Sequence, residues 1–152
     1  LDKVDILFIE NVGNLVCPAS FDLGQHRNVT LLSVPEGDDK PAKYPVMFRA
    51  ADLVLLTKLD LLPYLTEFDP ERAEHHLRHL ATDAPFARTT TRDRTGIEPW
   101  LAWLRAEAET QTERRTRGET ARPAIQPDGA HLHEAGATHS GGHGHHMHRH
   151  GA

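Results

Sequence analysis

The sequence predicts an α/β fold with a mostly parallel sheet, followed by a disordered tail. Short apolar runs alternate with amphipathic, helix-like stretches along residues 1–117. The apolar runs are continuous, which is typical of strands buried on both faces of a parallel sheet. From residue 118 onward the composition shifts to Gly, Pro, Ala, Thr and His. Residues 118–152 cannot bury enough apolar surface to offset chain entropy, so we predict a folded domain over 1–117 and a disordered tail.

Each expected element follows from a local pattern. Four apolar runs are predicted strands: Val4–Ile9, Val29–Val34, Leu53–Leu56 and the weaker Pro85–Thr90. Three stretches are predicted helices: Pro45–Ala51, the segment beginning at Asp69-Pro70-Glu71, and Ile97–Thr112. Strands that alternate with helices imply crossover connections between parallel strands.

The two longer helices carry further signals. Asp69 is a favourable N-cap, Pro70 suits the first helical position, and Glu71 suits the positive end of the helix dipole. The apolar residues of this helix share one face: Ala73, Leu77, Leu80 and Ala81. The last helix is expected to pack through three apolar side chains: Trp100, Leu101 and Leu104.

Composition excludes several classes of function. The formal net charge of −5 leaves no broad basic surface for nucleic acid. No apolar run approaches the roughly 18–20 residues needed to cross a bilayer, and no signal-peptide pattern opens the chain. The single cysteine, Cys17, excludes an internal disulfide and is typical of a reducing compartment. We therefore expect a cytoplasmic protein with neither a nucleic-acid nor a membrane partner.

The most informative motif is Thr57-Lys58-Leu59-Asp60, directly after the predicted strand Leu53–Leu56. A Lys-x-Asp motif in this position is typical of loops that read guanine. The Asp60 carboxylate would accept two N–H donors that adenine does not present on the same edge, and the Lys58 stem would pack over the purine ring. A base that lacks these two donors would leave the carboxylate without a partner, and the lost hydrogen bonds discriminate strongly against that base. A plain surface turn after a strand is the alternative interpretation.

A second motif, Ile9-Glu10-Asn11-Val12-Gly13, also follows a predicted strand. Glu10 is placed to face a magnesium–water shell, and the N–H of Gly13 can approach a terminal phosphate because no Cβ blocks it. An ordinary strand-to-loop turn is the alternative. A third, weak signal is Thr90-Thr91-Arg92 after the last predicted strand, where the backbone near Thr91 would contact the base oxygen.

Two longer segments carry a family resemblance: residues 10–25 (ENVGNLVCPASFDLGQ) and residues 35–45 (PEGDDKPAKYP). They closely resemble the hydrogenase nickel-incorporation GTPases, the HypB family, and the resemblance extends over about Asp2 to Leu104. It implies the C-terminal part of a SIMIBI-type P-loop NTPase fold. The implied function is that of a GTP-hydrolysing nickel metallochaperone that dimerises on GTP binding. The implied partners are a HypA-type accessory protein and the large-subunit precursor of [NiFe]-hydrogenase.

The resemblance also implies GTP, Mg2+, Ni2+ and Zn2+ as ligands. It places Glu10 and Gly13 in the switch segment, and Cys17 at a metal site near the nucleotide-dependent dimer interface. It places four residues around the nucleotide base: Thr57, Lys58, Asp60 and Thr91. A lone cysteine is otherwise most often a small buried apolar residue, and one thiolate cannot complete a zinc site.

The sequence departs from the family pattern at several positions. Gln25 stands in place of Glu, Thr57 in place of Asn, and Thr90-Thr91 in place of Ser-Ala. No Gly-x-x-x-x-Gly-Lys-Ser/Thr phosphate loop occurs, nor does the Cys-His pair that shares the metal in this family. Both belong upstream of Leu1, so we expect a fragment of the enzyme that does not hydrolyse GTP by itself.

Histidines are concentrated in the tail. Eight of the twelve lie there: His131, His133, His139, His143, His145, His146, His148 and His150. Imidazole suits Ni, Cu and Zn, and the interspersed glycines let several rings converge on one ion. We expect nickel storage or buffering, and a purification tag is the alternative. His75, His76 and His79 lie opposite the apolar face of their helix, where a solvated polar face is the favoured interpretation and a metal site the alternative.

Two other functions stay open at this point. The chain could serve as a non-enzymatic metal buffer whose active part is the tail. It could also belong to the sister nickel GTPases that serve urease, although the residues Asn14-Leu15-Val16-Cys17-Pro18 resemble the hydrogenase branch.

Overall fold

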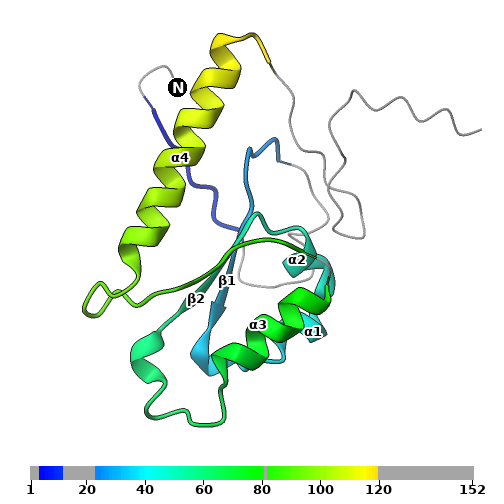
Figure 1. Ribbon diagram of the computed structural model, residues 1–152, viewed down its shortest axis with the longest axis vertical. Helices are drawn as coiled ribbons and strands as arrows, with labels where there is room; N and C mark the ends of the chain where they lie inside the picture. The colour runs from blue at the N-terminus through cyan, green and yellow to red at the C-terminus, as the bar shows by residue number, and fades with distance from the viewer. Residues whose placement is uncertain (1–3, 12–22, 81, 120–152) are drawn as a thin grey trace, which may run out of the picture.

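A three-stranded parallel sheet is the centre of the computed structural model, which describes residues 4–11, 23–80 and 82–119 (Figure 1). Its strands are β1 (Val29–Ser33), β2 (Leu53–Thr57) and β3 (Phe86–Arg88), in the order β1-β2-β3. Val29 is in register with Leu53, and Val54 with Phe86. The predicted α/β class and parallel sheet are therefore confirmed.

The central strand explains why its apolar run is continuous. Residues 53–56 of β2 are all at most 5% exposed, because both edges pair with a neighbour and both faces are covered. On β1, by contrast, Leu32 is 1% exposed and Leu31 is 58% exposed. The described part of the sheet is thus fully covered at its centre and open on one side of β1.

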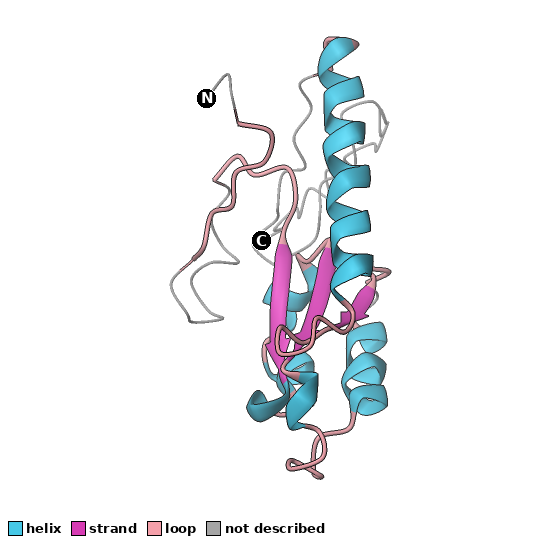
Figure 2. Ribbon diagram, turned by 90° about the vertical axis from the view of Figure 1, so that its left-hand side faces the viewer, coloured by secondary structure: helices cyan, strands magenta, loops and turns pink. Residues whose placement is uncertain are grey.

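Short helices and one longer helix cover one side of the sheet, and α4 lies on the other side (Figures 1 and 2). The covering elements are η2 (Val34–Glu36), α1 (Lys40–Lys43), α2 (Pro45–Arg49) and α3 (Pro70–His79), while η3 (Leu59–Leu61) follows β2. The core beneath them joins Leu32 and Leu56 of the strands to Phe48 of α2 and to Ala73 and Leu77 of α3. Each of these five side chains is at most 1% exposed.

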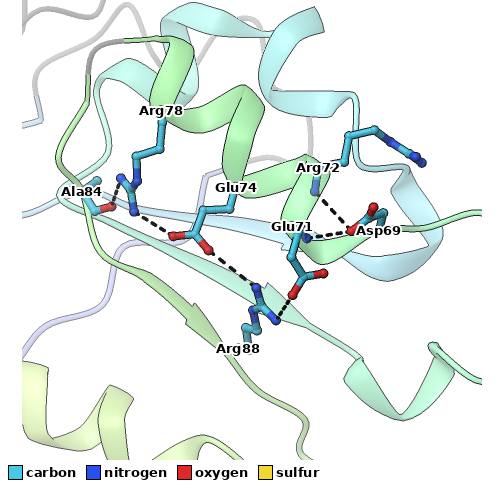
Figure 3. A network of polar contacts seen from close by, with 7 residues as sticks. All are labelled: Asp69, Glu71, Arg72, Glu74, Arg78, Ala84 and Arg88. Carbon is cyan, nitrogen blue, oxygen red and sulfur yellow. Dashed lines mark hydrogen bonds and ion pairs between the residues drawn. The ribbon is translucent and has the colours of Figure 1, made fainter.

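Helix α3 is anchored at its start and along one side. Asp69 caps it by accepting the backbone N–H groups of Glu71 at 2.9 Å and Arg72 at 3.2 Å. Figure 3 shows how Arg88 of β3 then bridges two acids of the helix, Glu71 at 2.9 Å and Glu74 at 3.5 Å. The predicted start at Asp69-Pro70-Glu71 is confirmed, and Leu80 forms the C-cap.

Helix α4 (Ile97–Thr116) begins at a tight junction with β3. Gly96, at φ +73°, is its N-cap, and a Cβ at this position would lie 1.8 Å from the carbonyl oxygen of Arg88. Trp100 stacks on Trp103 with ring centroids 5.7 Å apart, and Phe8 lies 6.4 Å from the Trp100 ring. The expected packing through Trp100, Leu101 and Leu104 is only partial, because all three are half-buried.

One predicted strand is wrong. Residues 4–11 form no regular secondary structure, and the apolar side chains of Val4–Ile9 are 42–66% exposed at every position that carries one. An apolar run becomes a buried strand only where a neighbouring strand accepts its backbone hydrogen bonds, and no described strand pairs with this segment. The predicted disordered tail lies outside the described residues beyond Glu119.

Candidate nucleotide-binding site

The Thr57-Lys58-Leu59-Asp60 motif lies at the carboxyl end of the central strand. Ligands of open α/β sheets bind at this edge. Thr57 ends β2, Lys58 adopts the left-handed conformation (φ 60°, ψ 40°), and Asp60 lies in η3. The reversal at Lys58 ends the strand and directs the chain into the loop. Its side chain is exposed, so the stem is available to cover a flat ring.

The Asp60 carboxylate is fixed by the loop after β3. The Thr90 hydroxyl donates to Asp60 Oδ1 at 2.6 Å, and Arg92 Nη1 lies 3.9 Å from Asp60 Oδ2. The Asp60 side chain nevertheless remains 24% exposed. A carboxylate that is oriented by a hydroxyl and still reachable from solvent can accept N–H donors from a ligand.

The two loops are joined by main-chain hydrogen bonds as well. Thr89 N–H donates to the Leu56 carbonyl at 2.8 Å, and Leu59 N–H donates to the Thr89 carbonyl at 3.4 Å. The 89–95 loop is closed by Thr90 N–H, which donates to the Thr95 carbonyl at 3.0 Å. The position of Asp60 is therefore set by contacts made from both strands.

The structure brings together some of the predicted base-binding residues. Lys58 and Asp60 lie in one turn, and Thr91 follows the hydroxyl that holds Asp60, with its own side chain exposed. Thr57 is directed elsewhere, because its hydroxyl donates to the Leu32 carbonyl of β1 at 3.3 Å. This hydrogen bond links the end of β2 to β1.

Sequence reasoning missed the role of Thr90. This residue is 5% exposed and provides the contact that orients Asp60. The contact depends on β3 lying next to β2, and this strand order is known from the structure and not from a local sequence pattern. Arg92, whose Nη1 lies 3.9 Å from Asp60 Oδ2, is a second residue of this loop whose role the sequence did not predict.

The segment that carries Glu10 is not part of this arrangement. Residues 4–11 lie toward the end of the sheet where β1 begins, whereas η3 lies at the opposite end (Figure 1). Glu10 is exposed there. Gly13, Cys17 and the eight tail histidines lie outside the described residues, so their predicted roles stay predictions.

Two features are absent from the described ranges 4–11, 23–80 and 82–119. Among these residues, no group of three or more His, Cys, Asp or Glu is placed to hold a metal ion. None of the helices they form is long and apolar enough to cross a membrane.

Comparisons with known proteins identify the family. The family model described as "CobW/HypB/UreG, nucleotide-binding domain" matches residues 1–88. The chain is 56% identical over 99 residues to the hydrogenase maturation factor HypB of Azotobacter vinelandii, covering 65% of this chain and 32% of that protein. It is 54% identical over 104 residues to HypB of Escherichia coli K12, covering 68% and 36%.

Solved structures of HypB proteins have the same fold. HypB from Helicobacter pylori in complex with nickel gives a TM-score of 0.62 at 38% identity, covering 66% of this chain and 46% of that one. HypB from Archaeoglobus fulgidus gives 0.60 at 35% identity, covering 64% and 47%. The chain spans about a third of the length of the two curated relatives above. The chain belongs to the CobW/HypB/UreG nucleotide-binding family, and within it resembles the hydrogenase maturation factors.

Proposed function

We propose that this chain is part of a GTP-hydrolysing nickel metallochaperone that serves the maturation of [NiFe]-hydrogenase. The observation that carries the proposal is the Asp60 carboxylate, held by the Thr90 hydroxyl at the shared carboxyl edge of β2 and β3. The family match supports a nucleotide at this edge. The names of the relatives support the hydrogenase role.

The chemistry of the base site follows from its donors and acceptors. Guanine presents an N1–H and an exocyclic amine on one edge, and both can donate to a carboxylate. Asp60 Oδ1 already accepts from Thr90, which orients the carboxylate, and the Asp60 side chain remains 24% exposed to a ligand. The exposed Lys58 stem would cover the ring.

The remaining roles rest on the resemblance and await test. Glu10 and Gly13 would sense Mg2+ and the terminal phosphate, and Cys17 would ligate Ni2+ or Zn2+ near a GTP-dependent homodimer interface. Together with a HypA-type accessory protein, this protein would deliver the metal to the hydrogenase large-subunit precursor in the cytoplasm. The histidines of residues 131–150 would hold a reserve of nickel beside the switch.

The decisive experiment changes the preferred base from guanine to xanthine, and it uses the protein encoded by the full open reading frame. Asp60→Asn replaces one acceptor by a donor, which suits the C2 carbonyl of xanthine and leaves the guanine amine without a partner. We expect GTP binding to weaken by at least about 100-fold and XTP binding to strengthen. Asp83→Asn, at an exposed acid outside the site, is the matched control. Unchanged GTP affinity in Asp60→Asn would disprove the base assignment.

A related function is favoured by one further comparison. The protein of Helicobacter hepaticus that is 47% identical over 97 residues is named a hydrogenase/urease maturation factor. We therefore propose urease as a second candidate recipient of the same nickel. Deleting the gene and assaying both nickel enzymes separates the two, because loss of hydrogenase activity alone would exclude urease.

The buffering role of the tail needs a separate measurement. Replacing the eight tail histidines by Gln keeps the chain length and should remove most of its Ni2+ capacity, as followed by equilibrium dialysis. If the substituted protein keeps its full capacity, the tail is not a nickel store, whatever the outcome at Asp60.

A further inference from the structure

Helix α3 carries a pair of histidines that the proposed function does not use. His75 and His79 are one helical turn apart, and their ring centroids lie 4.1 Å apart with the planes tilted by 50°. Both side chains are exposed. Among the residues that the structure describes, neither ring takes part in a hydrogen bond or an ion pair. Within this part of the chain, no hydrogen-bond or ion-pair partner occupies their ring nitrogens.

The packing of α3 directs this pair toward solvent. Ala73 and Leu77 are buried in the core, and Glu71, Glu74 and Arg78 lie on the side joined to β3 (Figure 3). Residues four apart lie on the same face of a helix, so the remaining face, opposite the core, presents His75 above His79. The salt bridges to Arg88 and the buried apolar side hold the helix in this rotation.

Two arginines flank the pair in the sequence, but the surrounding charges still permit a bound cation. Arg72 and Arg78 flank the pair, but Arg72 is bonded to Asp38 and Arg78 to Glu74. His79 is the last residue of α3, where the carbonyl groups at the helix end carry partial negative charge. The guanidinium groups are thus already paired, and the helix end attracts positive charge.

We propose that His75 and His79 form a two-ligand surface site for a divalent transition-metal ion that prefers imidazole, with Ni2+, Cu2+ and Zn2+ as the class. Imidazole nitrogens bind such ions at about 2.0–2.1 Å, so two of them on one ion lie about 3 Å apart. Rings whose centroids are 4.1 Å apart reach that spacing by side-chain rotation alone. Water completes the coordination shell. The site is independent of the proposed GTPase function, because it lies on α3 and involves none of the base-binding residues.

The test measures how strongly Ni2+ protects each histidine of α3 from chemical modification in the full chain. Because each histidine is followed separately, Ni2+ bound by the tail does not hide binding at α3. NiCl2 is titrated in while diethyl pyrocarbonate modifies neutral imidazoles, and each modified peptide is quantified by mass spectrometry. We expect Ni2+ to protect His75 and His79 together, at one midpoint concentration. His26, an exposed histidine with no other histidine near it in sequence, is the internal control.

The variants distinguish a chelating pair from two separate histidines. In His75→Gln, protection of His79 should require roughly 100-fold more Ni2+, because the second ligand of the chelate is lost. The reciprocal variant, His79→Gln, should affect His75 equally. His76→Gln, on the same helix but outside the pair, should leave both unchanged. Equal midpoints in the wild type and His75→Gln, or no protection of either ring, would overturn the proposal.

Discussion

Helices α3 and α4 are held to the sheet in opposite ways. The ten residues of α3 include two fully buried side chains, Ala73 and Leu77, and begin at the Asp69 cap. The twenty residues of α4 include no buried side chain, and its N-cap is Gly96, which has no side chain to cap the helix. The shorter helix thus has the stronger attachment. Packing of one face, more than length, determines how firmly a helix is fixed to its domain.

The largest expected change in the free energy of unfolding comes from a substitution at Gly96, at the start of α4. In Gly96→Ala, the new Cβ would lie 1.8 Å from the Arg88 carbonyl oxygen, so the junction with β3 must open. We expect a loss of more than about 4 kcal/mol in the free energy of unfolding. Gly118→Ala is the matched control, because Gly118 also has positive φ but no atom within 4 Å of a new Cβ. Its expected cost is about 1 kcal/mol, the strain of the left-handed conformation alone. Urea denaturation measures both, and equal losses would show that the close approach at Gly96 does not matter.

The same substitution in each helix tests the comparison directly. Leu77→Ala in α3 should cost about 3 kcal/mol, since the side chain is fully buried and its removal leaves a cavity. Leu101→Ala in α4 removes a half-buried side chain and should cost about 1 kcal/mol. Both changes alter helix propensity equally, so the difference between them reports packing. Comparable losses by urea denaturation would contradict the view that α4 is loosely attached.

The cap of α3 predicts a pH dependence. The backbone N–H of Arg72 and then that of Glu71 donate to Asp69, which lowers the pKa of its carboxyl below the ordinary value. A lowered pKa means that the stabilising effect is fully present above the unfolded value of about 3.9 and is lost as pH falls through the folded value. Asp69→Asn keeps a neutral cap. Its stability deficit relative to the wild type should therefore shrink as urea midpoints are taken from pH 6 to pH 2. A deficit that stays constant would rule out the charged cap.

The smallest effect is expected at the ion pairs between α3 and β3. Arg88→Met keeps the apolar stem but removes the bridges to Glu71 and Glu74. Because these groups are partly exposed, we expect a loss of about 0.5 kcal/mol that disappears near 1 M NaCl. Arg105→Met, which removes the longer pair with Glu98 in α4, should have no measurable effect. A loss at Arg88 that persists in high salt would point to packing instead of charge.

Elements were predictable from sequence where local and tertiary signals agreed. The start of α3 at Asp69-Pro70 was correct because cap, proline and apolar face all indicated the same boundary. Strand β2 was correct because its continuous apolar run matched burial on both faces. The stretch Val4–Ile9 is also apolar apart from Asp5, yet it is exposed coil. Hydropathy indicates what a segment can bury, whereas strand pairing depends on a partner elsewhere in the chain.

The candidate site was predictable in part for the same reason. Lys58 and Asp60 form a motif within one turn, so their proximity follows from sequence alone. The contact between Thr90 and Asp60 joins two loops through the order of strands in the sheet, which no local pattern records. Thr57 stays a predicted base-site residue, and its hydroxyl donates to the Leu32 carbonyl of β1. The direction of a side chain at the end of a strand depends on hydrogen-bond partners in the adjacent strand, here the Leu32 carbonyl.

The parallel register of the sheet also governs how this protein can fold. Val29 pairs with Leu53 and Val54 with Phe86, so every described strand pairing spans a full crossover and none is a hairpin. Pairings between residues far apart in sequence form slowly, because the loop must close before any contact compensates for the lost entropy. During synthesis, the edge of β2 that pairs with β3 therefore stays unpaired until residues 86–88 have left the ribosome. The central strand, whose residues 53–56 are at most 5% exposed in the finished structure, therefore has an unpaired edge while the chain is being made.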